Sequence, residues 1–62
     1  MRIRILYDIE MRYGDTILAG SVGNVIGDGV RFPKECVYGL PTGCDPTYDF
    51  NHIISYPHEI LQ

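Results

Sequence analysis

The sequence predicts a small all-β domain of five strands. Two β-branched runs flank an Asp-Gly pair in residues 19–32, a pattern typical of a β-hairpin with a two-residue turn. Residues 2–7 alternate, so that Ile3, Ile5 and Tyr7 share one face of a strand and the arginines the other. With 62 residues the chain has the length of one domain, which we expect to span residues 1–62 and to lack a deep, enclosed site.

The other elements follow from the spacing of polar residues, glycine and proline. Residues 8–18 interrupt their apolar positions with charges and Gly14, which predicts a long excursion that folds as an irregular hairpin. The second and third strands are expected at 20–26 and 29–32, around a turn at Asp28-Gly29. Residues 33–49 hold three of the four prolines and predict a long loop.

The C-terminal part of the chain predicts two more strands. Residues 49–56 recover an apolar, β-branched pattern and are interpreted as the fourth strand. Pro57 and the two polar residues after it suit one tight turn of 3-10 type. Ile60 and Leu61 then form a short fifth strand.

This order of elements resembles the SH3-like barrel, on the residues of segments 3–8, 19–26, 30–32 and 55–61. The glycine-punctuated middle segment looks like KOW-type domains and small bacterial SH3-like proteins with no assigned activity. The resemblance implies a five-stranded barrel with a 3-10 turn before the last strand. KOW-type relatives bind RNA or ribosomal and transcription partners, SH3 domains bind proline-rich peptides, and other SH3-like barrels dock on larger enzymes. The chain lacks the basic residues of the first group and the tryptophan of the second, so no functional residue is carried over.

Composition argues against several classes of function. The formal net charge is −3, whereas nucleic-acid binders concentrate positive charge to neutralise phosphates. No apolar run approaches the roughly 20 residues that span a bilayer, so we expect no membrane partner. Asp8 and Glu10 interrupt the apolar segment that a secretory signal needs, and we therefore expect a cytoplasmic protein with Cys36 and Cys44 as thiols.

No motif predicts catalysis, a metal or a cofactor. Cys36, Cys44, His52 and His58 are the residue types that bind zinc, but seven residues separate the two cysteines, too many for a zinc knuckle. Neither cysteine sits at a predicted helix N-terminus or among cations, where a thiolate would be stabilised. We expect no catalytic residues, so the chain is predicted not to be an enzyme.

The tyrosines are the best candidates for a binding surface. Tyrosine combines a large contact area with a polar tip, and it is enriched at protein interfaces. The strand pattern assigns Tyr7 and Tyr56 to partial burial. We therefore predict a protein-interaction or accessory module that docks on a larger protein through an aromatic and acidic patch. Its residues are Tyr13, Tyr38, Tyr48, Asp15 and Asp45.

Three other readings remain open. One is a KOW-like nucleic-acid module that uses the four arginines, and another is an acidic mimic of nucleic acid. Self-association through exposed strand edges and spare aromatic residues is the third. The arginines are Arg2, Arg4, Arg12 and Arg31, and the acidic residues are Asp8, Glu10, Asp15, Asp45 and Asp49.

Overall fold

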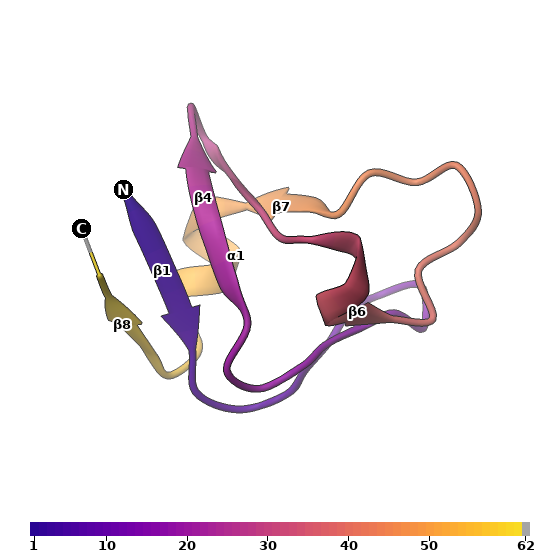
Figure 1. Ribbon diagram of the computed structural model, residues 1–62, viewed down its shortest axis with the longest axis horizontal. Helices are drawn as coiled ribbons and strands as arrows, with labels where there is room; N and C mark the ends of the chain where they lie inside the picture. Colours follow the sequence, from indigo (N-terminus) through magenta and orange to yellow (C-terminus); the bar gives the residue numbers. More distant parts are fainter. Residues whose placement is uncertain (62) are drawn as a thin grey trace.

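The structure is a computed structural model that describes residues 1–61, and most of its regular elements are strands (Figure 1). The strands form two antiparallel sheets. The larger sheet has the order β7-β5-β4-β1-β8, with β1 at Arg2–Ile5, β4 at Val22–Ile26, β5 at Gly29–Arg31, β7 at Thr47–Asp49 and β8 at His58–Ile60. The smaller sheet has the order β2-β3-β6, with β2 at Ile9–Glu10, β3 at Thr16–Ile17 and β6 at Val37–Tyr38.

The predicted predominance of strands is confirmed, but the chain also forms a short helix and its strands do not close into one barrel. After β1 the chain leaves the larger sheet and returns to it only at Val22. The intervening segment folds back and pairs with itself, with Ile9 opposite Ile17. It then pairs with β6, with Thr16 opposite Tyr38. These pairings build a second sheet where the sequence indicated one continuous barrel wall.

The segment predicted as the fourth strand is mostly helical, which corrects the sequence interpretation. After the short strand β7, residues Phe50–Ile54 form helix α1, which Figure 1 shows behind β1 and β4. The Asp49 carboxylate accepts a hydrogen bond from the backbone N–H of His52 at 3.1 Å and so caps the helix. The helix places Ile53 fully in the core. The predicted 3-10 turn at 57–59 is also wrong, because His58 and Glu59 already belong to strand β8, and the 3-10 helix η1 of the structure lies at Lys34–Cys36.

The hairpin of β4 and β5 is confirmed, with its turn one residue earlier than predicted. Ile26 pairs with Gly29, so Gly27 and Asp28 are the two turn residues. Gly27 has a φ of 59°, and every residue with a positive φ among residues 1–61 is a glycine. A glycine at the first turn position is the arrangement that two-residue hairpins with one left-handed residue require.

The predicted hairpin in the excursion is present as β2 and β3, closed by a hydrogen bond of 2.7 Å from Met11 N–H to the Asp15 carbonyl. The loop predicted at 33–49 is shorter than expected, because η1, β6 and β7 occupy much of it. Residues 39–46 remain as the irregular part, and Figure 1 shows this segment extending away from the sheets.

The core lies between the two sheets and α1. It consists of eight buried side chains: Ile3, Ile5, Ile9, Ile17, Val30, Phe32, Val37 and Ile53. Gly23, opposite Ile3, lets two of them approach the backbone. A Cβ on Gly23 would lie 2.6 Å from Val30 Cγ1 and 2.9 Å from the ring of Phe32.

Candidate binding groove

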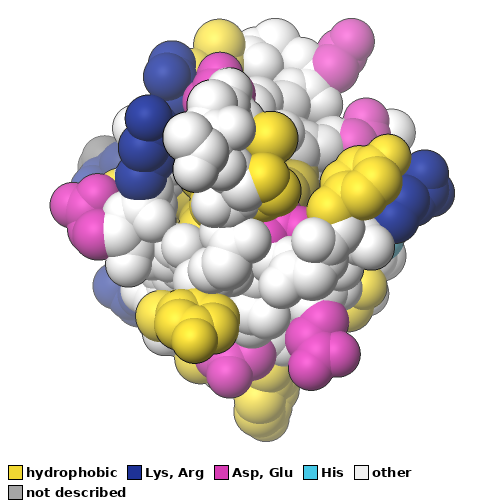
Figure 2. Space-filling view, turned by 90° about the vertical axis from the view of Figure 1, so that its right-hand side faces the viewer, with side chains coloured by type: hydrophobic (Ala, Val, Ile, Leu, Met, Phe, Trp, Pro, Cys, Tyr) yellow, Lys and Arg dark blue, Asp and Glu magenta, His cyan; other side chains and the backbone are white. Residues whose placement is uncertain are grey.

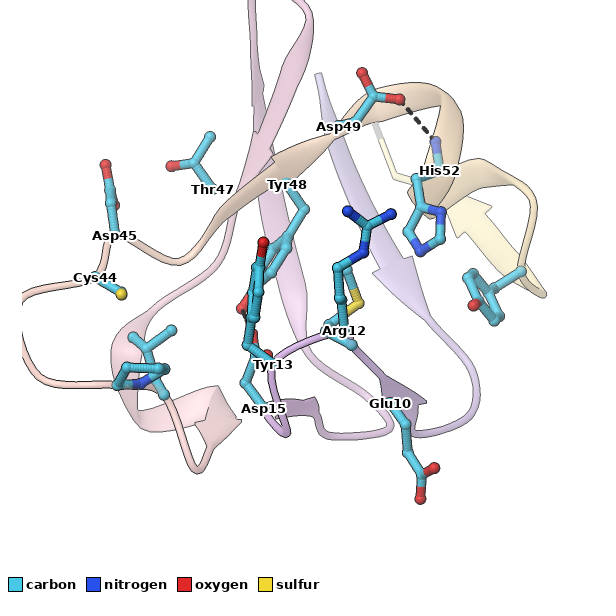
Figure 3. A pocket seen from close by; sticks show the side chains of 14 residues that line it. Glu10, Arg12, Tyr13, Asp15, Cys44, Asp45, Thr47, Tyr48, Asp49 and His52 are labelled. Atoms are coloured by element: carbon cyan, nitrogen blue, oxygen red, sulfur yellow. Dashed lines mark hydrogen bonds between the residues drawn. The ribbon is translucent and has the colours of Figure 1, made fainter.

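An open groove of about 1050 Å³ lies beside the core, and its walls come from both sheets. One wall is β2 and the turn that follows it, and the other is β7 with the start of α1 (Figure 3). Residues 40–45 of the irregular loop border the groove at one end. The groove therefore exists because the chain forms two sheets and not one closed barrel.

Asp15 and Tyr48 join the two walls. The Tyr48 hydroxyl donates a hydrogen bond of 2.6 Å to Asp15 Oδ2. Register explains why Tyr48 points inward, because it pairs with the buried Val30 on β5. Burial of the phenol and its hydrogen bond to the Asp15 carboxylate raise the pKa of Tyr48 above the usual tyrosine value, so Tyr48 is the proton donor at neutral pH.

Asp15 carries an unsatisfied oxygen. The residue is only 4% exposed, and its Oδ1 atom is buried with no hydrogen-bond partner among residues 1–61. A buried acceptor without a partner costs about 1–3 kcal/mol, more for a charged group. Asp15 also lines the groove, so the charge of its carboxylate favours a cationic ligand group there.

The groove carries more acidic than basic side chains. Glu10, Asp15, Asp45 and Asp49 line it, and Arg12 is its one arginine or lysine within the described residues. Asp45 also contacts Arg31, with 3.4 Å between Oδ1 and Nε, but both side chains are more than half exposed. This exposed pair contributes little stability and leaves Asp45 accessible to a ligand.

Aromatic side chains supply the rest of the contact area. Tyr13 lies on the turn after β2 and is 78% exposed, and Figure 3 shows it beside Tyr48 and Asp15. The rings of His52 and Tyr56 pack edge to face with centroids 5.4 Å apart, and both residues line the groove. On the face that Figure 2 shows, an acidic side chain is recessed between hydrophobic side chains, with lysine and arginine side chains nearer the margins.

The structure brings together four of the five residues predicted to bind a partner. Tyr13, Asp15, Asp45 and Tyr48 all line the groove, although Asp15 is buried where the sequence suggested an exposed acid. Tyr38 lies on β6 and is 75% exposed, but it is not part of the groove lining.

Sequence reasoning missed several groove residues. Arg12 was considered only as a nucleic-acid contact, and His52 was considered as a zinc ligand and rejected. Tyr56 is half-buried as predicted, while Tyr7 is 66% exposed, because β1 ends at Ile5 and no longer orients it. The spacing of His52 and Tyr56, four residues apart, would have placed them together only if the helix had been recognised.

The other candidate groups are dispersed. Within residues 1–61 no cluster of three or more histidine, cysteine or acidic side chains is placed to hold a metal ion. Both cysteines are free, Cys36 half-buried and Cys44 exposed at the groove. Asp8 is not part of the groove lining and accepts a hydrogen bond from the Ala19 N–H at 2.7 Å.

Three of the four arginines, Arg2, Arg4 and Arg31, lie on the outer face of the larger sheet, and Arg12 does not. The register places Arg2 and Arg31 in one row across the larger sheet, on either side of Asn24. Arg4 forms an ion pair with Glu59, and Arg12 lines the groove.

Comparison with known proteins gives no match to a protein-family model, a curated protein or a solved structure. In the described part of the chain, no helix has the length and apolar character needed to cross a bilayer.

Proposed function

We propose that this protein is a non-catalytic interaction module that docks on a larger protein by taking an extended, basic segment of it into the groove. The observation that carries this proposal is the meeting of Tyr13, Asp15, Asp45 and Tyr48 on one groove, although 35 positions in the sequence separate the first from the last. Tyrosines provide contact area and the acids provide charge, which is the composition of an interface and not of a reaction centre.

Charge complementarity supports a basic partner. The four acidic side chains of the groove exceed its single arginine, and one of them, Asp15, keeps an oxygen without a donor. The charge of the Asp15 carboxylate attracts an ammonium or guanidinium group into the groove, and the exposed ring of Tyr13 offers such a cation a π face.

An SH3-like relationship is part of the proposal. The resemblance depends on the order first strand, excursion, hairpin, loop, strand, 3-10 turn and final strand. The observed order β1, β2–β3, β4–β5, η1, β6, β7, α1 and β8 supports it in its first strand, excursion, hairpin and final strand, while α1 replaces most of the fourth strand. The absence of tryptophan argues for a ligand set different from that of proline-rich peptide binders.

Selection from a random dodecapeptide library displayed on phage tests the proposal. We expect selected peptides to be rich in lysine or arginine and to bind a Tyr13→Ala variant at least about fivefold more weakly. Tyr38→Ala is the matched control, because Tyr38 is equally exposed but outside the groove, and it should change affinity less than about twofold. A selection that yields no binder, or equal losses in both variants, would overturn the proposal.

A further inference from the structure

We propose that the segment held in the groove binds as an added β-strand on the free edge of β7. This inference rests on the proposed function and specifies how the partner is recognised. Strand β7 ends the order of the larger sheet, so only its β5 side is paired. Thr47, Tyr48 and Asp49, the whole of β7, line the groove.

The register shows which main-chain groups of β7 point away from β5. Phe32 N–H donates to the Pro46 carbonyl at 2.9 Å, and Phe50 N–H donates to the Asp28 carbonyl at 2.8 Å. Hydrogen-bonded pairs alternate along an antiparallel ladder, so Tyr48 directs its N–H and carbonyl toward Val30. The N–H and carbonyl groups of its two neighbours on β7 therefore point to the open edge.

Two of these four edge groups are already used. Thr47 N–H donates to the Asp45 carbonyl at 2.8 Å. Asp49 is the N-cap of α1, and the carbonyl of an N-cap residue accepts the first hydrogen bond of its helix. The Thr47 carbonyl and the Asp49 N–H remain, one acceptor and one donor on either side of Tyr48.

An extended chain beside β7 satisfies both groups at once, because its own N–H and carbonyl groups alternate with the same spacing. The residue of that chain opposite Tyr48 projects its side chain to the face on which Tyr48 lies. Asp15 lies on the same side, because the Tyr48 hydroxyl hydrogen-bonds to its carboxylate. A basic side chain at this one position is therefore directed toward the side of the groove where the Asp15 carboxylate lies, and the main-chain bonds set its register.

Proline substitution at Asp49 removes the proposed donor with little change in backbone geometry. Asp49 has a φ of −63°, which a proline ring adopts, and the residue before it is extended, as a residue before proline should be. Asp49→Ala is the matched control, since it loses the same carboxylate and helix cap but keeps the N–H. We expect the tightest-binding selected dodecapeptide to bind Asp49→Pro about fivefold more weakly than Asp49→Ala. Circular dichroism spectra of both variants serve as the control that they remain folded.

Amide hydrogen exchange of the unaltered protein gives a second readout that needs no variant. The Asp49 N–H should exchange fast in the free protein and at least tenfold more slowly when the peptide is bound. The Tyr48 N–H, already paired with β5, should be protected in both states.

The two proposals fail in distinguishable ways. A peptide that binds the groove, with equal affinity for the two Asp49 variants and no protection of the Asp49 N–H, would overturn strand addition and leave the docking function standing. A phage selection that yields no binding peptide would overturn both the docking function and strand addition.

Discussion

The Tyr48 hydroxyl hydrogen-bonds to the Asp15 carboxylate at 2.6 Å, across 33 positions of sequence and between the two sheets. Tyr48 belongs to β7 of the larger sheet, and Asp15 directly precedes β3 of the smaller one. No other donor among residues 1–61 hydrogen-bonds to this carboxylate, so the contact both links the two walls of the groove and orients its buried acid.

Replacing Tyr48 with phenylalanine should destabilise the fold. The variant keeps the ring but removes the only donor to a carboxylate that is 4% exposed, leaving both of its oxygens without a partner. We expect the free energy of unfolding to fall by about 1–3 kcal/mol in urea denaturation. Tyr38→Phe, which removes an exposed hydroxyl, should change it by less than about 0.5 kcal/mol. Equal effects of the two substitutions would contradict the structural role of the bond.

Stability should also fall at alkaline pH, in a way that depends on Tyr48. Burial and the Asp15 hydrogen bond raise the pKa of Tyr48 in the folded state, so the folded protein keeps a proton that the unfolded chain releases above pH of about 10. The Tyr48 contribution is thus complete below that pH and is lost as the pH rises toward the raised folded-state value. In urea denaturation between pH 8 and 11, the free energy of unfolding should fall more steeply with pH for the unaltered protein than for Tyr48→Phe. If the two plots of this free energy against pH were parallel, the pKa of Tyr48 would be the same in the folded and unfolded states, which would contradict the account.

Gly23→Ala should destabilise the core by overpacking. The new Cβ would lie 2.6 Å from Val30 Cγ1, closer than packed side chains tolerate. We expect a cost of about 1–3 kcal/mol from thermal or urea unfolding. Asn24→Ala, on the exposed face of the same strand, should cost less than about 0.5 kcal/mol. A stabilised Gly23→Ala variant would show that Val30 and Phe32 do not cover this glycine.

The position of α1 is tested by two neighbouring substitutions. Ile53 is fully buried and Asn51 is exposed. Ile53→Ala should cost about 2–5 kcal/mol, because it leaves a cavity in the core. Asn51→Ala should be neutral or slightly stabilising, since alanine has the higher helix propensity. A destabilising Asn51→Ala would argue against the helix.

The sequence predicted the elements whose signals are local. Alternation placed Ile3 and Ile5 on the buried face of β1, and the glycine-rich pattern identified the hairpin of β4 and β5. The turn was displaced by one residue because the pattern offers glycines both before and after Asp28, and pairing across the hairpin decides between them. Alternation could not show that β1 ends before Tyr7.

Long-range contacts could not be predicted in the same way. The apolar run at 50–54 is too short for its periodicity to separate strand from helix, and the Asp49 cap was the only local sign of α1. Strands β3 and β6 have two residues each, so neither contains a sequence pattern long enough to predict that they pair. For this reason the tyrosine and acid candidates were identified, but the burial of Asp15 beneath Tyr48 was not.

Chemical-shift mapping by NMR, with a lysine- or arginine-rich dodecapeptide from the library selection, measures directly where the partner segment lies. The amide signals of Glu10, Tyr13, Asp15, Tyr48 and Asp49 should shift most as the peptide is added. Largest shifts at Arg2, Asn24 and Arg31, on the outer row of the larger sheet, would contradict binding in the groove.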